Sequence, residues 1–167
     1  MVPKKSRLYF KSFTDAYWEG SVDDWNITSG AAFFLGNCLV SWLSKKQSSI
    51  SLSTSEAEYI VVASCCTQVI WMKQKLEYLL VKYEHPIIIN CDNTSAINIS
   101  KNPVMHSKTK HIPSKYHFLR EQVSQKVFKL DYLDTKEHVA DIFTKPLPKE
   151  SFEHLIWKLG VIPLQQL

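Results

Sequence analysis

The feature that most restricts the fold of this chain is a long helical pattern followed by an apolar strand pattern. One face of a helix running to about Leu80 is predicted by alternating steps of four and three residues through positions 58, 62, 65, 69, 72, 76 and 79. Residues 86–91 (PIIINC) then predict a strand covered on both faces, and therefore a central, parallel strand. Because parallel strands are joined through a crossover, we expect an α/β sheet.

Strand patterns also precede this helix. Residues 8–14 (LYFKSFT) predict a first strand, and residues 15–30 are rich in turn-forming side chains. The apolar runs 31–35 and 38–43 are separated by Gly36 and Asn37, a two-residue step that indicates a β-hairpin. An antiparallel unit is therefore expected ahead of the parallel strands.

The remainder of the chain alternates between helical and strand patterns. The expected elements are a short helix at 94–100, a helix with Pro113 in its first turn, a strand at 127–133, a short helix at 136–144 and a C-terminal helix at 152–159. We predict a five-stranded mixed sheet, an antiparallel hairpin plus parallel strands, flanked by helices. The expected organisation is a loose segment at 1–6, one domain at 7–148 and a helical tail at 149–167.

The composition is that of a single globular domain. The chain has 167 residues, of which 45% are hydrophobic, enough for a substantial core. A net charge of +4 and an isoelectric point near 8.8 favour a polyanionic partner. The sequence shows no signal-peptide core and no apolar run of membrane-spanning length, so we expect an intracellular protein with no membrane partner. The cysteines form no C-x-x-C pair, and we expect reduced thiols rather than disulfides or zinc ligands.

Two aspartates lie where two of the expected strands end. Asp15 follows the first strand, and Asp92 follows the apolar strand at 87–91. If these strands pair in parallel, the two carboxylates become neighbours at an edge where open α/β sheets bind ligands. The alternative is that both are turn formers, and that Asp92 with Asn93 caps the next helix.

A glutamate of the long helix points towards the same edge. Glu56 and Glu58 are about 200° apart around a helix and therefore occupy opposite faces. Glu58 shares the apolar stripe that must pack on the sheet, whereas Glu56 follows Ser53 at the spacing of a capping box. Because a carboxylate on a packed face needs a metal ion or hydrogen bonds, Glu58 is the functional candidate.

A fourth acid, Asp141, lies in the short helix after the last expected strand. Alone it indicates no more than a solvated helical aspartate, and it gains weight from the other three. Together Asp15, Glu58, Asp92 and Asp141 can hold two Mg²⁺ ions, with Mn²⁺ as an alternative, because hard cations prefer oxygen ligands. Two ions about 4 Å apart assist in-line hydrolysis of a phosphodiester. The sequence therefore predicts a catalytic metal site made of these four acids.

Basic side chains gather in two stretches that could contact phosphates. The alternative for each of them is a solvated basic face. The candidate nucleic-acid contacts are Lys45, Lys46, Gln47, Asn93, Lys108, Lys110, His111 and Lys115. Trp42 and Trp71 lie in apolar patterns and are expected in the core, whereas Trp18 is expected near the substrate groove.

Seven segments carry a resemblance that spans nearly the whole chain in order. They are FTDAYWEG (13–20), TSGAAFFLG (28–36), VSWLSKKQ (40–47), STSEAEY (53–59), CDNTSAI (91–97), KTKHIPSKYHFLRE (108–121) and VADIFTKPLP (139–148). They strongly resemble the ribonuclease H domain of the Pol polyproteins of copia-type LTR retrotransposons. The resemblance implies an RNase H fold and Mg²⁺-dependent cleavage of the RNA strand of RNA–DNA hybrids. Asp15, Glu58, Asp92 and Asp141 match the four acidic positions of that family.

The resemblance also implies partners and leaves alternatives open. It implies a polyprotein with a reverse transcriptase portion, no small-molecule cofactor, and a location in cytoplasmic virus-like particles or the nucleus. The chain departs from the family at Tyr17, Trp25 and Pro113, which favours the alternative of a catalytically decayed remnant with at most weak nucleic-acid binding. His138 could act as a proton shuttle, although a surface histidine is the expected reading. An integrase or transposase core ranks third, because such cores need a late glutamate.

Overall fold

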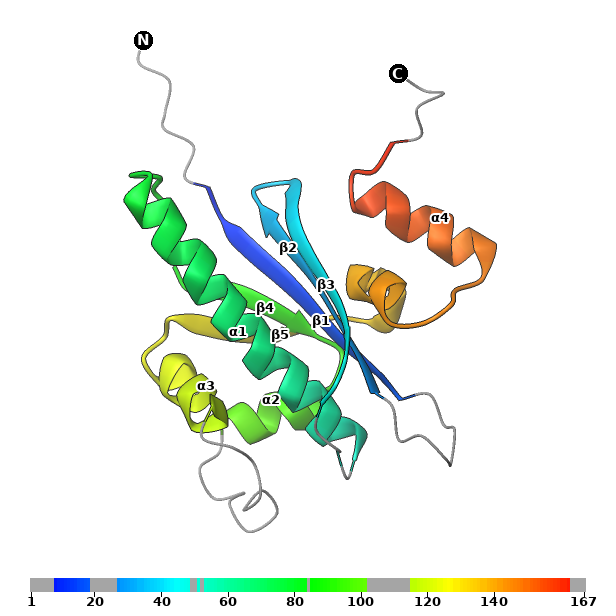
Figure 1. Cartoon of the computed structure of the whole chain (residues 1–167), viewed down its shortest axis with the longest axis horizontal. Coiled ribbons are helices and arrows are strands. Elements are labelled where there is room, and N and C mark those ends of the chain that lie inside the picture. Colours follow the sequence, from blue (N-terminus) through cyan, green and yellow to red (C-terminus); the bar gives the residue numbers. More distant parts are fainter. Residues whose placement is uncertain are drawn as a thin grey trace.

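The computed structural model describes residues 8–18, 27–48, 51, 53–83, 85–101 and 115–162. They form a five-stranded sheet in the order β3-β2-β1-β4-β5, with helices on both faces (Figure 1). The predicted mixed sheet is confirmed, because antiparallel pairs and parallel pairs both occur in it. Within these residues no helix combines the length and the apolar character that crossing a membrane would require.

The antiparallel half consists of β1 (Phe10–Trp18), β2 (Ile27–Leu35) and β3 (Cys38–Lys46). The predicted hairpin is confirmed at Gly36 and Asn37, where Gly36 has a φ of +63° that a residue without Cβ adopts at low cost. The strands are longer than the apolar runs suggested. β1 and β2 stay paired as far as Trp18 and Ile27, so polar residues that resembled a turn are part of the ladder.

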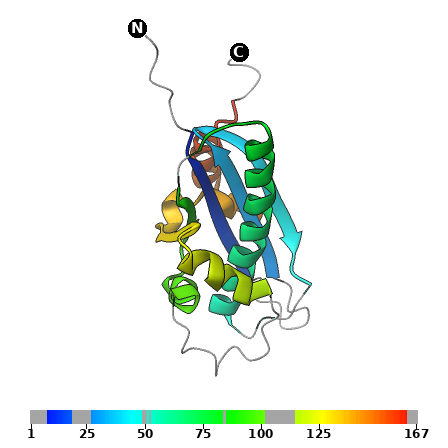
Figure 2. The ribbon, with the colours of Figure 1, turned by 90° about the vertical axis from the view of Figure 1, so that its left-hand side faces the viewer.

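The parallel half contains the long helix and the apolar strand that the sequence predicts. α1 (Thr54–Tyr78) leads to β4 (Ile87–Cys91), which pairs in parallel with β1 on one side and with β5 (Phe128–Tyr132) on the other. Between β4 and β5 lie α2 (Thr94–Lys101) and α3 (Lys115–Ser124). All three helices cover one face of the sheet, and Figure 2 shows α2 and α3 beside the N-terminal half of α1.

The stripe predicted for α1 faces the sheet, with Val62, Cys65 and Val69 buried in the main core. Ser53 caps the helix, and its hydroxyl accepts a hydrogen bond from the backbone N–H of Glu56 at 3.1 Å. The stripe leaves the core at its C-terminal end, where Leu79 is exposed. All four cysteines are free thiols, as expected.

The other face of the sheet is covered by η2 (Thr135–Glu137), η3 (Val139–Phe143) and α4 (Lys149–Lys158). Two 3₁₀ turns thus replace the single helix expected at 136–144, because His138 between them has an extended ψ of 93° that breaks the helical path. A second core joins the sheet to these elements and contains Ala32, Phe34, Val139, Leu155 and Leu159. Alternate residues of β2 therefore face opposite layers.

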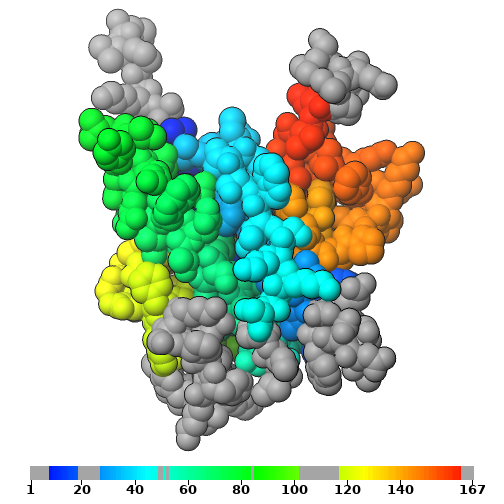
Figure 3. Space-filling model, viewed as in Figure 1, coloured from blue at the N-terminus to red at the C-terminus, as the bar shows by residue number. Residues whose placement is uncertain are grey.

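Two tryptophans expected in the core are on the surface instead. Trp42 is 63% exposed and Trp71 is 53% exposed. Trp42 lies on the edge strand β3, where exposed and half-buried side chains alternate, and β3 is at the surface between α1 and α4 (Figure 3). Trp71 is outside the stripe of α1 that faces the sheet. Local apolar patterns did not distinguish a strand at the edge of the sheet from a central one.

A candidate metal centre where the parallel ladder ends

Asp15 is positioned by the different lengths of the two ladders on β1. The parallel ladder with β4 ends at Thr14 and Cys91, whereas the antiparallel ladder with β2 continues past the pair Asp15 and Gly30. Asp15 was expected after the end of its strand, and it lies inside it. It is nevertheless the first residue beyond the parallel pairing, so the predicted closeness to the end of β4 is retained.

Glu58 reaches this place from α1, on one face of the sheet. Ala16, which lies beyond the end of the parallel ladder, donates its backbone N–H to Glu58 Oε1 at 2.8 Å. Because the ladder with β4 ends at Thr14, the N–H of Ala16 has no partner on that strand and is available to the Glu58 carboxylate. Glu58 is 4% exposed, which agrees with its expected position on the packed face of α1.

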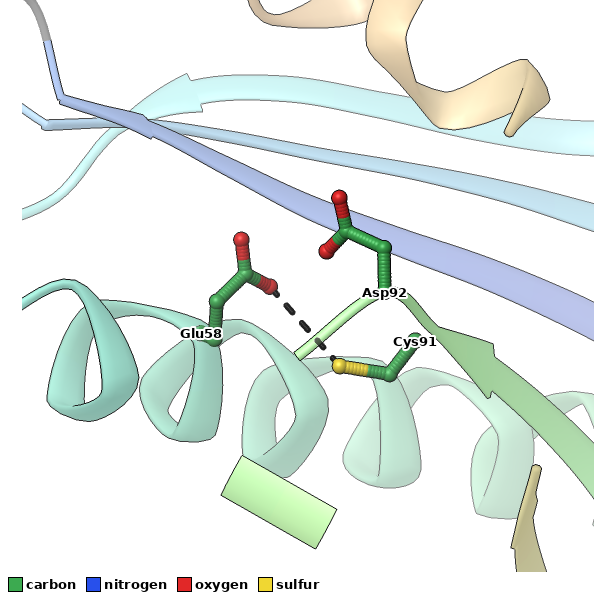
Figure 4. A group of neighbouring side chains, drawn as sticks. All are labelled: Glu58, Cys91 and Asp92. Atoms are coloured by element: carbon green, nitrogen blue, oxygen red, sulfur yellow. Dashed lines mark hydrogen bonds between the residues drawn. The ribbon is translucent and has the colours of Figure 1, made fainter. Parts of the chain in front are cut away.

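Asp92 follows the last residue of β4 and faces Glu58 (Figure 4). One ligand atom from each of Glu58, Cys91 and Asp92 lies within 4.8 Å of the others. Burial, followed by the nearby Glu58 carboxylate, raises the pKa of the Cys91 thiol to about 12. Cys91 is therefore a neutral thiol at physiological pH, and the two carboxylates are the better ligands for a hard cation.

Asp141 comes from η3, on the other face of the sheet. It is buried, and its Oδ2 atom forms an ion pair with Lys145 Nζ at 2.8 Å. The same ammonium is 3.8 Å from Asp15 Oδ2, and the hydroxyl of Thr144 also donates to that oxygen. Lys145 and Thr144 thus connect Asp15 on the sheet with Asp141 in the η3 layer.

Electrostatic interactions join the four acids into one group, although α1 and η3 cover opposite faces. The pKa of Glu58 is raised to about 9, mainly by burial and then by Asp15 and Asp92, while the hydrogen bond from the Ala16 N–H and the charge of Lys145 oppose the rise. Burial also raises the pKa of Asp141, against the hydrogen bond from Lys145 and with a contribution from Asp15. Asp15 and Asp92 both lie just beyond the end of the parallel ladder, Glu58 lies beside Asp92, and Lys145 bridges Asp15 and Asp141. That the four acids form one metal site stays a prediction.

These residues fit a divalent metal ion. The donor set is made of carboxylate oxygens, the ligands that Mg²⁺ and Mn²⁺ prefer. Among the described atoms, the buried Oδ1 of Asp141 has no hydrogen-bond partner, so it retains a lone pair for a cation. The raised pKa of Glu58 agrees with a metal site, because a buried carboxylate beside other acids favours its protonated form until a cation binds.

The raised pKa of Glu58 predicts how stability depends on pH without metal. Between its unfolded value of 4.5 and its folded value of about 9, the folded protein holds a proton that the unfolded chain releases. The free energy of unfolding should therefore fall as pH rises through this window, by at most about 1.4 kcal/mol per pH unit from this group. Chemical unfolding of the wild type and of Glu58→Gln in a chelator, from pH 5.5 to 8.5, measures the difference. Parallel pH profiles for the two proteins would contradict the assignment.

The candidate nucleic-acid residues are placed differently from one another. Lys45 and Lys46 are exposed at the end of β3. They follow Ser44, which pairs across the sheet with Gly30, and Gly30 in turn pairs with Asp15.

Two other candidates have local structural contacts. The Gln47 amide donates to Ser29 Oγ at 3.0 Å and to the Ala57 carbonyl at 3.1 Å, which fastens α1 to the sheet. Asn93 accepts from the Ala96 N–H and caps α2, the alternative left open for this turn. Lys108, Lys110 and His111 lie outside the described residues, and only the backbone of Lys115 is described.

Sequence reasoning missed two residues beside Asp15 and Asp141, namely Thr144 and Lys145, and it misplaced His138, the possible proton shuttle. The expectation of a surface His138 is wrong, because its side chain is fully buried, packs edge-on against Phe13 and has Nδ1 3.7 Å from Asp141 Oδ1. Thr144 and Lys145 belong to the segment 139–148 quoted above, so the resemblance contained the signal. Their residue types alone gave none, since a lysine before a proline is typical of a solvated turn.

The order of the strands and the placement of the helices are those of an RNase H-like fold. The N-terminal RNase H domain of rv2228c from Mycobacterium tuberculosis superposes with a TM-score of 0.56 at 9% identity, covering 90% of this chain and 97% of that one. LC11-RNase H1 in complex with RNA/DNA hybrid gives a TM-score of 0.57 at 11% identity, covering 81% and 93%. At these identities the likeness shows the fold alone.

Sequence comparison connects the chain to retrotransposons. It is a homologue of one segment of the retrovirus-related Pol polyproteins: 38% identical to that of transposon RE2 from Arabidopsis thaliana over 159 residues, 95% of this chain. The polyprotein of transposon TNT 1-94 from Nicotiana tabacum is 38% identical over 143 residues, 86% of this chain. The chain spans 11% of the length of either relative. No family model matches it.

Proposed function

We propose that this domain is a divalent-metal-dependent ribonuclease H that hydrolyses the RNA strand of RNA–DNA hybrids during reverse transcription of a retroelement. The observation that supports the proposal is the placement of Asp15 and Asp92 just beyond the end of the parallel ladder, with Glu58 beside Asp92 and with Lys145 bridging Asp15 to Asp141. Phosphodiester hydrolysis at a pair of metal ions needs such a group of oxygen ligands.

The comparisons support the substrate and the setting. A solved relative of the same fold was crystallised with an RNA/DNA hybrid, and the sequence relatives are Pol polyproteins. A hybrid is the proposed substrate, and the reverse transcriptase portion of such a polyprotein is the proposed partner. The proposed location is intracellular, in cytoplasmic virus-like particles or the nucleus. Mg²⁺ is the proposed ion, with Mn²⁺ as an alternative.

The chain's own residues would contribute holding, orientation and charge. The four acids would hold the ions, which when bound activate water for attack and stabilise the departing 3′ oxygen. The Ala16 N–H orients Glu58, while Thr144 and Lys145 orient Asp15 and Asp141. Lys45 and Lys46, exposed at the same end of the sheet, would attract the phosphates of the hybrid with an affinity that falls as salt rises.

Cleavage of a hybrid with a labelled RNA strand tests this function. The wild type should cut the RNA with Mg²⁺ and not in a chelator, and should leave double-stranded DNA intact. Asp92→Asn should cleave at least about a hundredfold more slowly, because it removes a charge from the metal ligands. Equal cleavage by both proteins would indicate another site or a contaminant. A folded but inactive wild type would favour the alternative, a decayed remnant.

A further inference from the structure

Lys145 occupies a central position among the four acids. Its ammonium contacts Asp141 Oδ2 at 2.8 Å and Asp15 Oδ2 at 3.8 Å, and it lies 5.9 Å from the ring centroid of Tyr17. It also interacts electrostatically with Asp92 and Glu58. The side chain is only 21% exposed, so this placement is not that of a lysine extended into solvent.

The metal centre is therefore divided into two unequal halves. In the first, Glu58 and Asp92 face each other, and Glu58 accepts from the backbone N–H of Ala16 and from the thiol of Cys91, neither of which carries a positive charge. In the second, Asp15 and Asp141 share the ammonium of Lys145. A metal ion entering the second half would meet a positive charge that already binds the oxygens it needs.

The lysine has room to leave. Lys145 and Asp141 are in the wall of an open pocket of about 560 Å³ whose other lining residues include Lys136, Glu150 and His154. A lysine ammonium sits on a flexible stem with several rotatable bonds, so it can exchange one set of acceptors for another without moving the backbone. Glu150, which also lines the pocket, is an alternative acceptor.

We propose that Lys145 is an internal counter-ion that competes with a divalent cation for Asp15 and Asp141. This inference rests on the proposed function, because it concerns the same metal centre. Without metal, the ammonium offsets one of the two negative charges in the second half of the site and connects the sheet to the η3 layer. When a cation binds there, the ammonium must give up both carboxylates, since two positive charges cannot share these oxygens at contact distance. Part of the binding free energy of the metal is therefore spent on displacing the lysine.

The test measures metal binding by Lys145→Met without nucleic acid. Methionine keeps the length of the stem and removes the charge. Titration of Mn²⁺, by calorimetry and by the rise in melting temperature, should show affinity about tenfold tighter than in the wild type. Before metal is added, the variant should melt at a lower temperature than the wild type, and saturating metal should narrow that difference. Opposite effects of one substitution on stability and on affinity distinguish competition from general damage.

Lys149→Met is the matched control. Lys149 is four residues further along the chain, carries the same charge and is 87% exposed at the start of α4, where it forms an exposed ion pair with Glu153 at 3.8 Å. Its removal tests the loss of one positive charge outside the metal centre, since an exposed ion pair contributes little to stability. Lys145→Gln is the second variant should methionine prevent folding. Unchanged or weaker Mn²⁺ affinity in a folded neutral variant would overturn the proposal, even if the wild type cleaves hybrids. Tighter binding in the variant, with no cleavage by the wild type, would support it and count against the nuclease instead.

Discussion

Glu58→Gln is expected to lower the rate of Mg²⁺-dependent hybrid cleavage by about a thousandfold or more, equivalent to about 4 kcal/mol of transition-state stabilisation. Glu58 interacts with Asp15 and with Asp92, so it links the acid on β1 to the acid that follows β4. Glutamine is nearly the same size, and its carbonyl can still accept the Ala16 N–H. The loss should therefore come from the missing charge. Single-turnover cleavage at saturating Mg²⁺ measures it.

Glu56→Gln provides the control for this experiment. It removes an identical charge two residues away, on the opposite side of α1. Glutamine also serves at this position of a capping box, so the start of the helix should be preserved. We expect cleavage within about twofold of the wild type. Similar losses in the two variants would show that the rate follows the net charge of the helix rather than the metal centre.

Gly30→Ala is expected to destabilise the fold by about 2 to 3 kcal/mol and to impair the metal centre as well. A Cβ at this position would lie 2.5 Å from Thr144 Cγ2, 2.9 Å from the Ala140 carbonyl oxygen and 3.2 Å from Phe143 Cβ. The added methyl group would displace residues 140–144, the segment that supplies Asp141 and the Thr144 hydroxyl. Gly30 is also the register partner of Asp15, so the clash would occur beside the metal centre. Chemical unfolding and Mn²⁺ titration measure the two effects.

A second substitution can relieve part of this clash. Thr144→Ser removes the Cγ2 atom and keeps the hydroxyl that donates to Asp15. The double variant should recover part of the lost stability, and the remaining contacts with Ala140 and Phe143 should prevent full recovery. Additive effects of the two substitutions would mean that the layers do not approach each other as closely as described.

The sequence predicted what depends on ladder order and helical period. An apolar run at 87–91 required parallel neighbours, and parallel strands bring their carboxyl ends together, which is why Asp15 and Asp92 could be paired in advance. The choice of Glu58 over Glu56 followed from the angle between them around α1. Both inferences rest on local geometry, the direction of the strands and the angle between residues on a helix, which tertiary contacts do not change.

What the sequence did not predict depends on contacts between layers. The break at His138 places Asp141 in a 3₁₀ turn under the sheet, and no local pattern distinguishes this from one short helix. Lys145 resembled a surface lysine because the acids that attract it are distant in sequence. Trp42 resembled a core residue because its apolar neighbours did not reveal that β3 is an edge strand.

The four acids come from both faces of the sheet, and this affects the order in which they assemble in a newly synthesised chain. Strands β1 to β5 can complete their ladders before η3 exists, so a ribosome-bound chain could hold a finished sheet with three acids in place. The fourth arrives only with residues 139–145, which must also dock beneath Gly30. A growing polypeptide of this kind would lack one of the four proposed metal ligands until its last layer docks.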